Sequence, residues 1–278
     1  MANSSGSAET APNESNVALL DVFKQFGQLL DDKNDRFERI VKLSRDITIE
    51  SKRIIFHLHR ITSVKGESAI CNSADVIESK GAEREVIIGE ADRRLNKLCN
   101  EKFYRIAEEL RNCDHFHYHR GYCFGLEEFI EAKSLCHYIA TGQLINLEQI
   151  QECVNFHEEP NDDSKELYVT VTAFDLIMGL ADLTGELMRL SINAVSGGDL
   201  EYPFRICAFL TKLYEGFSTL GTDTIQLKDY GNKVRTLKMN LTKVEKTCYL
   251  LRIRQTEVPK HLLAQAIKSS AFDDHDQV

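Results

Sequence analysis

The segment 172–193 constrains the fold of this chain more than any other, because it predicts a long helix with almost no polar face. Thr172 and Asp175 have the spacing of a capping box, which starts a helix. Leucines then recur at helical spacing, at positions 176, 180, 183, 187 and 190. A helix that is apolar almost all round is typically buried. We therefore expect this helix in the middle of a helical protein.

One line of polar side chains nevertheless runs along that helix. It includes Asp175, and from Asp182 it continues through Glu186, Arg189 and Asn193 in steps of four, three and four residues. The last four groups therefore share a face. A buried carboxylate without a partner is costly. Asp182 and Glu186, one turn apart, need a cation, a proton or another partner.

A second segment, 125–132, supplies more carboxylates. Glu128 and Glu131 stand three residues apart in an apolar helical pattern, which makes them neighbours on one helix surface. If this helix packs against the first, four carboxylates converge, and hard oxygen ligands of this kind suit Mg²⁺ or Mn²⁺. Helix bundles build such metal sites from facing helices. The alternative is a solvated acidic face, with Arg189 paired to Glu186 in a structural network.

Composition limits the classes of function. The chain has 278 residues, of which 42% are hydrophobic and 28% charged, and this is ordinary for a soluble globular protein. The formal net charge is −9, and an acidic chain is a poor nucleic-acid binder on its own. A role with nucleic acid therefore requires a local basic face, a metal or a basic partner subunit. No proline stands between Pro12 and Pro160, so long helices are permitted.

The cysteines indicate a reducing compartment. There are eight, and no two of them form a C-x-x-C pair, so zinc-finger spacing is missing. The N-terminus lacks the apolar core of a secretory signal, and no apolar run is long enough to span a membrane. We therefore expect reduced thiols, a location in the cytosol or nucleus, and no membrane partner.

Hydrophobic periodicity predicts an all-α fold of about seven helices in an elongated bundle. The expected helices are 17–62, 74–110, 115–140, 146–156, 172–196, 204–220 and 224–254. Glycines 81 and 89 are expected to divide the second helix, and the polar segment 31–36 to fray or bend the first. The one extended segment is 166–172. A single helical domain over 16–268 should lie between disordered tails at 1–15 and 269–278.

Two further groups are candidate binding sites. His115 and His119 lie one turn apart and could hold a metal, but partly exposed histidines at a helix start are the favoured interpretation. The helix 224–254 is the most basic element and is a candidate phosphate-facing surface. A solvated lysine face is the alternative.

Five motifs together resemble the translin family, and within it the branch of translin-associated factor X. They are Lys42–Arg53 (KLSRDITIESKR), His59–Thr62 (HRIT), Gly125–Ala132 (GLEEFIEA), Ala181–Arg189 (ADLTGELMR) and Val258–His261 (VPKH). The run at 181–189 is specific enough to make the match close, and the resemblance extends from about residue 20 to residue 268.

The resemblance implies a curved fold of seven helices that assembles with translin into a hetero-octamer. Such a complex is expected to be a Mg²⁺-dependent endoribonuclease that cleaves single-stranded RNA, with single-stranded DNA as a further ligand. It is expected to promote RNA interference by degrading the nicked passenger strand as the silencing complex is activated, and to trim precursor-tRNA fragments. The expected location is the cytoplasm and the nucleus.

The resemblance also assigns roles to the acidic residues. The family's catalytic carboxylates fall on Glu128, Glu131 and Asp182, and Glu186 joins Glu131 in binding Mg²⁺, for which Mn²⁺ is a substitute. Phosphodiester cleavage needs a metal that neutralises phosphate charge and activates water, and convergent carboxylates provide its site. The rival class of function is a non-catalytic helical scaffold that stabilises translin and binds nucleic acid or other proteins.

Overall fold

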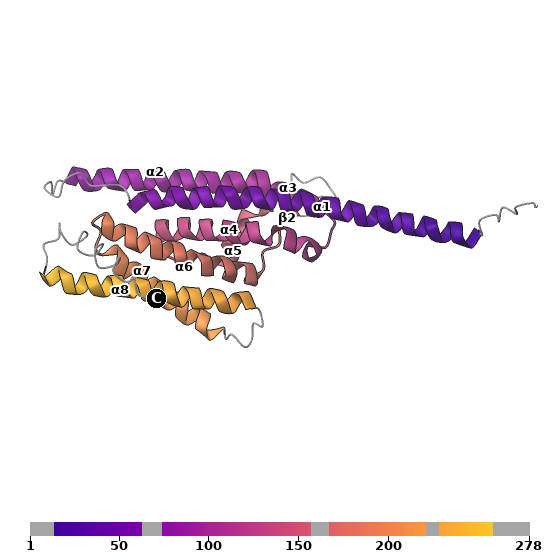
Figure 1. Cartoon of the computed structure of the whole chain (residues 1–278). Coiled ribbons are helices and arrows are strands. Elements are labelled where there is room, and N and C mark those ends of the chain that lie inside the picture. The colour runs from indigo at the N-terminus through magenta and orange to yellow at the C-terminus, as the bar shows by residue number, and fades with distance from the viewer. Residues whose placement is uncertain (1–13, 63–73, 157–166, 221–227, 258–278) are drawn as a thin grey trace, which may run out of the picture.

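Long helices laid side by side account for almost all of the structure (Figure 1). It is a computed structural model and describes residues 14–62, 74–156, 167–220 and 228–257. The helices are α1 (Glu14–Leu58), α2 (Ala74–Leu98), α3 (Tyr104–Leu110), α4 (His115–Thr141), α5 (Leu147–Cys153), α6 (Ala173–Ser196), α7 (Tyr202–Thr219) and α8 (Lys228–Glu257). A 3-10 turn, η1 (His59–Thr62), continues α1, and a π-helical turn, η2 (Cys99–Phe103), joins α2 to α3. With α2, η2 and α3 taken as one rod, these residues form seven helical rods, which confirms the expected fold.

α6 lies in the middle of the bundle, as its apolar sequence predicts. It packs against α4, α7 and α8, while α1 packs against α4 and α2 lies along α1 (Figure 1). Leu183, Leu187 and Leu190 of α6 are fully buried in a continuous apolar core to which all the long helices contribute. Leu176, in the first turn, is only partly buried against it. α4 and α6 are therefore held between α1 and α2 on one side and α7 and α8 on the other.

Local hydrogen bonds set both ends of α6. At its start, the Asp175 amide donates to the Thr172 hydroxyl at 3.1 Å, and the Thr172 amide donates to the Asp175 carboxylate at 2.9 Å. This is the capping box that the sequence predicts. At its end, the Gly197 amide donates to the carbonyl oxygens of Asn193 and Ala194. α6 therefore has the bounds expected from its sequence.

The rod formed by α2, η2 and α3 differs from the expectation. α2 runs unbroken through Gly81 and Gly89, and the regular helix changes only at η2. The predicted break was wrong because a glycine inside a helix costs only about 1 kcal/mol relative to alanine. Ile87, Ala91 and Leu95 anchor this stretch of α2 in the core, which outweighs that cost.

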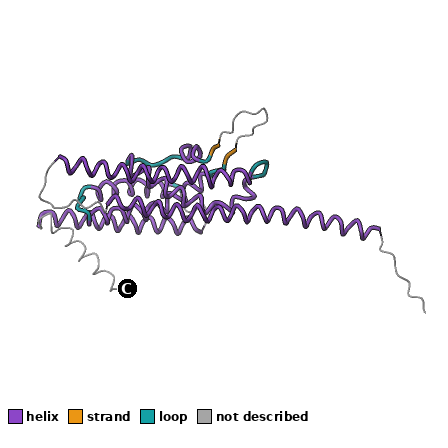
Figure 2. Tube along the Cα trace, turned by 90° about the horizontal axis from the view of Figure 1, so that it is seen from above, coloured by secondary structure: helices purple, strands orange, loops and turns teal. Residues whose placement is uncertain are grey.

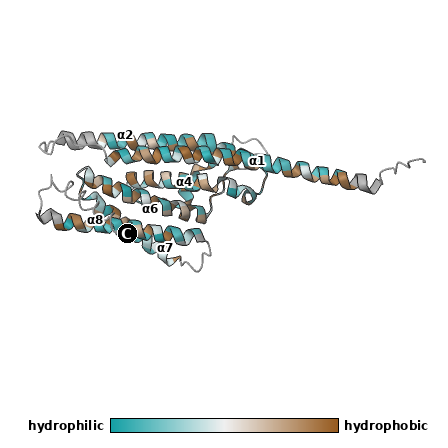
Figure 3. Ribbon diagram, viewed as in Figure 1, coloured by the Kyte–Doolittle hydropathy of each residue, from teal (hydrophilic) through white to brown (hydrophobic). Residues whose placement is uncertain are grey.

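α1 is one helix that extends well beyond the bundle (Figure 2). The fraying or bend expected at 31–36 was wrong, since α1 is helical through that segment. The ribbon of its projecting part shows brown, hydrophobic stretches in Figure 3. The exposed apolar residues there are Leu19, Leu20, Val22, Phe23, Phe26, Leu29 and Leu30. No other described element covers this surface.

A short antiparallel ladder stands between α5 and α6. β1 (Asn155–Phe156) pairs with β2 (Leu167–Tyr168), with Asn155 opposite Tyr168. The extended conformation expected at 166–172 is confirmed for β2. α5 begins after Asn146, which caps it as expected, but it ends at Cys153 rather than near 156 because β1 enters the ladder.

The seven described cysteines are all free thiols, as predicted. None of the described helices combines the length and the apolar character needed to cross a membrane. α1 begins at Glu14, within the segment 1–15 expected as a tail. The tail 269–278 lies outside the described residues.

Replacing Gly179 by Ala tests the close contact between α6 and α4. An added Cβ would lie 2.6 Å from the Ile130 side chain and 2.9 Å from the Glu127 carbonyl oxygen, so the helices must separate. We expect Gly179→Ala to lower the free energy of unfolding by about 1–3 kcal/mol. Urea denaturation followed by circular dichroism measures this change.

Gly89→Ala is the matched control, because an added Cβ there meets no atom within 4 Å. It should raise stability by up to about 1 kcal/mol, since alanine favours a helix more than glycine does. Equal effects of the two substitutions would contradict the packing described for α4 and α6.

Candidate acidic metal site

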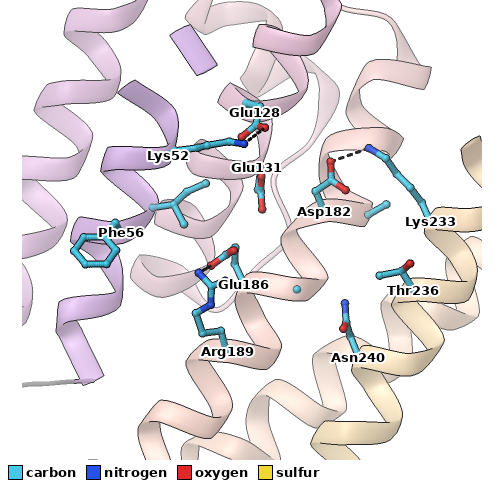
Figure 4. A pocket seen from close by; sticks show the side chains of 13 residues that line it. Lys52, Phe56, Glu128, Glu131, Asp182, Glu186, Arg189, Lys233, Thr236 and Asn240 are labelled. Carbon is cyan, nitrogen blue, oxygen red and sulfur yellow. Dashed lines mark hydrogen bonds and ion pairs between the residues drawn. The ribbon is translucent and has the colours of Figure 1, made fainter. Parts of the chain in front are cut away.

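A cavity of about 610 Å³ opens between α1, α4, α6 and α8, a volume typical of ligand sites (Figure 4). All four carboxylates predicted from the sequence line it. Glu128 and Glu131 come from α4, and Asp182 and Glu186 come from α6. In Figure 4, α1 forms one wall and α8 the opposite one. The packing of α4 against α6 therefore brings together the groups that the two sequence patterns supply.

Glu131 lies deepest among them, with 9% of its surface exposed. Within the described part of the chain, no side chain forms a hydrogen bond or ion pair with it. The pKa of Glu131 is raised to about 8, first by burial and then by the charges of three neighbouring carboxylates. These are Asp182, Glu128 and Glu186, and nearby Lys52 opposes the shift only in part. A site that disfavours the charge of its central carboxylate favours either a proton or a cation there.

Glu128 and Asp182 each face a lysine from a different wall. Lys52 of α1 lies 2.9 Å from Glu128, and Lys233 of α8 lies 2.7 Å from Asp182. The Glu128 Oε2 atom is buried and has no hydrogen-bond partner among the described residues. The Asp182 side chain is 43% exposed, so it lies at the edge of the cavity rather than in the core.

Lys233 is a site residue that the sequence did not single out. Its ammonium group donates to Asp182, to the Glu127 carboxylate at 3.1 Å and to the Met178 carbonyl oxygen at 3.1 Å. An ammonium group has three donors, so all of them are used. Lys233 thus ties α8 to both acidic helices. In the sequence, Lys233 is one of many basic residues on the helix 224–254. Only the packing of α8 on α6 shows that this lysine reaches the carboxylates.

Glu186 is held by a histidine and an arginine. His59 Nε2 lies 2.5 Å from its carboxylate, and the Arg189 guanidinium donates to the same oxygen at 3.1 Å. Burial acts to raise the pKa of Glu186, but the His59 hydrogen bond and the Arg189 charge outweigh it and lower that pKa. The pairing of Arg189 with Glu186 was predicted. His59 was noted only as part of a motif, because η1 had to be placed beside α6 before its contact could be known.

The donor chemistry of the cavity fits a hard divalent cation. Carboxylate oxygens are the ligands that Mg²⁺ and Mn²⁺ prefer. The buried Glu128 Oε2 atom lacks a hydrogen-bond partner among the described residues. As the side chains lie, however, no three His, Cys, Asp or Glu groups among the described residues are close enough to hold one ion. Three of the carboxylates are turned toward their own cation instead. Ion binding would therefore replace these contacts.

Asp175, His115 and His119 do not line this cavity. Asp175 is buried at the start of α6, where it accepts hydrogen bonds within the capping box and lies 2.9 Å from His119 Nε2. His115 Nδ1 lies 2.9 Å from the Thr170 hydroxyl. The two histidines thus contact different partners, which agrees with the structural interpretation favoured for them. The phosphate-facing role of α8 stays a prediction.

Comparison with known proteins gives related sequences. A model described as the Translin family matches residues 35–255. Translin-associated protein X of Rattus norvegicus is 38% identical over 271 residues, covering 92% of this chain and 87% of that protein. The Translin-associated protein X homolog of Schizosaccharomyces pombe is 25% identical over 236 residues, covering 84% and 89%. Translin of Homo sapiens is 30% identical over 140 residues, covering 50% and 58%.

Two solved structures have a similar fold. Apo-NeC3PO aligns with a TM-score of 0.56 at 20% identity, covering 88% of this chain and 100% of that one. AfC3PO in a complex with duplex RNA aligns with a TM-score of 0.54 at 17% identity, covering 85% and 99%. At these identities the likeness concerns the fold alone.

Replacing Glu131 by Gln tests the electrostatics of the cavity. The folded-state pKa of about 8 lies above the ordinary value of 4.5, so between these values only the folded chain keeps the Glu131 proton. This group therefore lowers the free energy of unfolding as pH rises from about 4.5 to 8. We expect Glu131→Gln to remove that loss, so that its stability relative to the wild type grows across this window.

Urea denaturation at a series of pH values measures the difference. Glu148→Gln, at an exposed position of α5, is the control for the loss of one carboxylate. If the difference in free energy of unfolding between Glu131→Gln and the wild type stays constant with pH, the pKa of Glu131 is not raised in the folded chain.

Proposed function

Because the chain belongs to the translin family, we propose that it is the catalytic subunit of a metal-dependent endoribonuclease formed with translin. One observation carries this proposal: Glu128, Glu131, Asp182 and Glu186 line one cavity between two packed helices. Its 38% identity to Translin-associated protein X over most of both chains supports the choice of subunit.

In the proposed reaction, Glu131 and Glu186 hold a Mg²⁺ ion, and Mn²⁺ can replace it. The bound ion would neutralise phosphate charge and activate a water molecule. Glu128 and Asp182 complete the site or orient the attacking water. A partner that fixes a ligand's orientation is part of such a site, and the His59 contact does this for Glu186.

The basic side chains around the cavity can also bind the substrate. Lys52, Arg189 and Lys233 line its walls and are each paired with a carboxylate. When the carboxylates turn to an ion, these groups are freed to contact the phosphates of an RNA strand. The cavity thus supplies both the negative charge that a metal needs and the positive charge that the substrate needs.

We propose translin as the partner subunit. A chain with a net charge of −9 gains from a partner with basic RNA-binding surface. The uncovered apolar part of α1 is a surface that an assembly would bury. The hetero-octamer expected from the family would provide both.

The biological setting is proposed from the family resemblance. The substrate is single-stranded RNA, with single-stranded DNA as a further ligand. The roles are degradation of the nicked passenger strand during activation of the silencing complex and trimming of precursor-tRNA fragments. The location is the cytoplasm and the nucleus. AfC3PO, one of the proteins with a similar fold, has been solved with duplex RNA.

A non-catalytic scaffold is the second candidate, and one observation favours it. Three of the four carboxylates already have a cation partner, which is also how a structural ion-pair network is built. In that case the chain would stabilise translin and bind nucleic acid or proteins without cleaving RNA.

A nuclease assay of the complex co-purified with translin separates the two candidates. We expect Mg²⁺-dependent cleavage of single-stranded RNA, and Asp182→Asn or a Glu128→Ala/Glu131→Ala double variant should slow it by more than about 100-fold. The reason is that loss of even an outer partner of a metal ligand costs about 10- to 100-fold. Mass measurement should show an unchanged assembly.

Glu148→Gln, which does not line the cavity, is the control and should cleave at the wild-type rate. A double variant that keeps full activity in an intact complex would refute the catalytic role and leave the scaffold.

A further inference from the structure

One large aromatic ring lies exposed at the edge of the acidic cavity. The Phe56 side chain is 76% exposed, although it lines the same cavity as the four carboxylates. In Figure 4 it stands on the α1 side, across from Asp182 and the α8 residues. Exposing a phenylalanine to water next to charged groups gains nothing for folding, since its burial would stabilise the chain. A ligand in the cavity is what this ring can contact.

The residues one helical turn before and after Phe56 are basic. Lys52 lies one helical turn before it on α1, and Arg60 lies one turn after it in η1. All three side chains are exposed, and the spacing of four residues places them on one face. Arg189 of α6 faces the cavity next to Glu186 and is also exposed.

This combination of groups is typical of proteins that bind a single nucleic-acid strand. Such proteins use cations to follow the phosphate backbone and aromatic rings on which unpaired bases stack. Building on the function proposed above, we propose that Phe56 is a base-stacking platform for the single-stranded RNA whose phosphate lies at the carboxylates. Lys52 and Arg60 hold the phosphates on either side of the stacked base.

The exposed ring favours single-stranded RNA over duplex RNA. A base in a duplex already stacks on its neighbours and offers no free face, whereas a base of a single strand can turn out onto Phe56. The ring and the carboxylates line one cavity of about 610 Å³, so a stacked base fixes the backbone beside the acidic groups. Phe56 therefore selects for an unpaired nucleotide at the site of cleavage.

Binding of a fluorescein-labelled oligouridine to the complex co-purified with translin tests this role. The measurement is fluorescence anisotropy in Mg²⁺, with Asp182→Asn present in every variant compared so that cleavage is slow. We expect Phe56→Ala to weaken binding by about 5- to 100-fold, which is the effect of losing one stacked base. Phe56→Trp should retain binding, because a larger ring offers at least the same stacking surface.

Phe124→Ala is the matched control, since Phe124 of α4 is 69% exposed but does not line the cavity. It should bind the oligouridine like the wild type. A second probe, an oligoribonucleotide with abasic residues throughout, should bind the wild type and Phe56→Ala equally. A duplex of the same length should also show no loss with Phe56→Ala.

Three results would overturn the stacking role. One is an unchanged affinity of Phe56→Ala for the oligouridine, and another is an equal loss for the abasic strand or the duplex. The third is dissociation of the complex on mass measurement, because Phe56 would then belong to a subunit interface. None of these depends on cleavage, so a wild-type complex that binds RNA without cutting it would reject the nuclease while leaving this test valid.

Discussion

Mutual repulsion among carboxylates is the constraint around which this molecule is arranged. Glu131 shares its cavity with three other acidic groups, and burial makes its charge still less favourable. The chain tolerates this because the leucines of α6 are fixed in the core and the N-terminal capping box fixes where the helix begins. Basic side chains from three directions then contact the other three carboxylates. Lys52 comes from α1, Lys233 from α8, and His59 and Arg189 meet at Glu186.

The acidic cavity depends on a close contact between α4 and α6. Gly179 lets α6 approach Ile130 and the backbone of α4, and this approach brings the two pairs of acidic side chains to one cavity. α1 and α8 then form the outer walls and carry the basic groups. A cavity built in this way can exchange internal ion pairs for contacts with a metal and a phosphate backbone, which is the change that the proposed nuclease requires.

Much of this could be predicted from the sequence, and the reasons are local. The acidic pairs Glu128/Glu131 and Asp182/Glu186 were identified because helical spacing places each pair on one face, and the helix bounds followed from Thr172, Asp175 and the apolar periodicity. The contacts of His59 and Lys233 were not identified. Their partners lie 127 and 51 residues away in the chain, so only the packing of η1 and α8 against α6 reveals them. The continuity of α2 through Gly81 and Gly89 was missed for the same reason, since the core supports it.

The most direct test of this account is a crystal structure of the translin complex grown with Mn²⁺, whose anomalous scattering locates the ion. The account predicts a peak about 2.1 Å from carboxylate oxygens of Glu131 and Glu186, with Lys52 or Lys233 turned away from its present carboxylate. A peak at another place, or an occupied complex in which every ion pair of the cavity is unchanged, would contradict it.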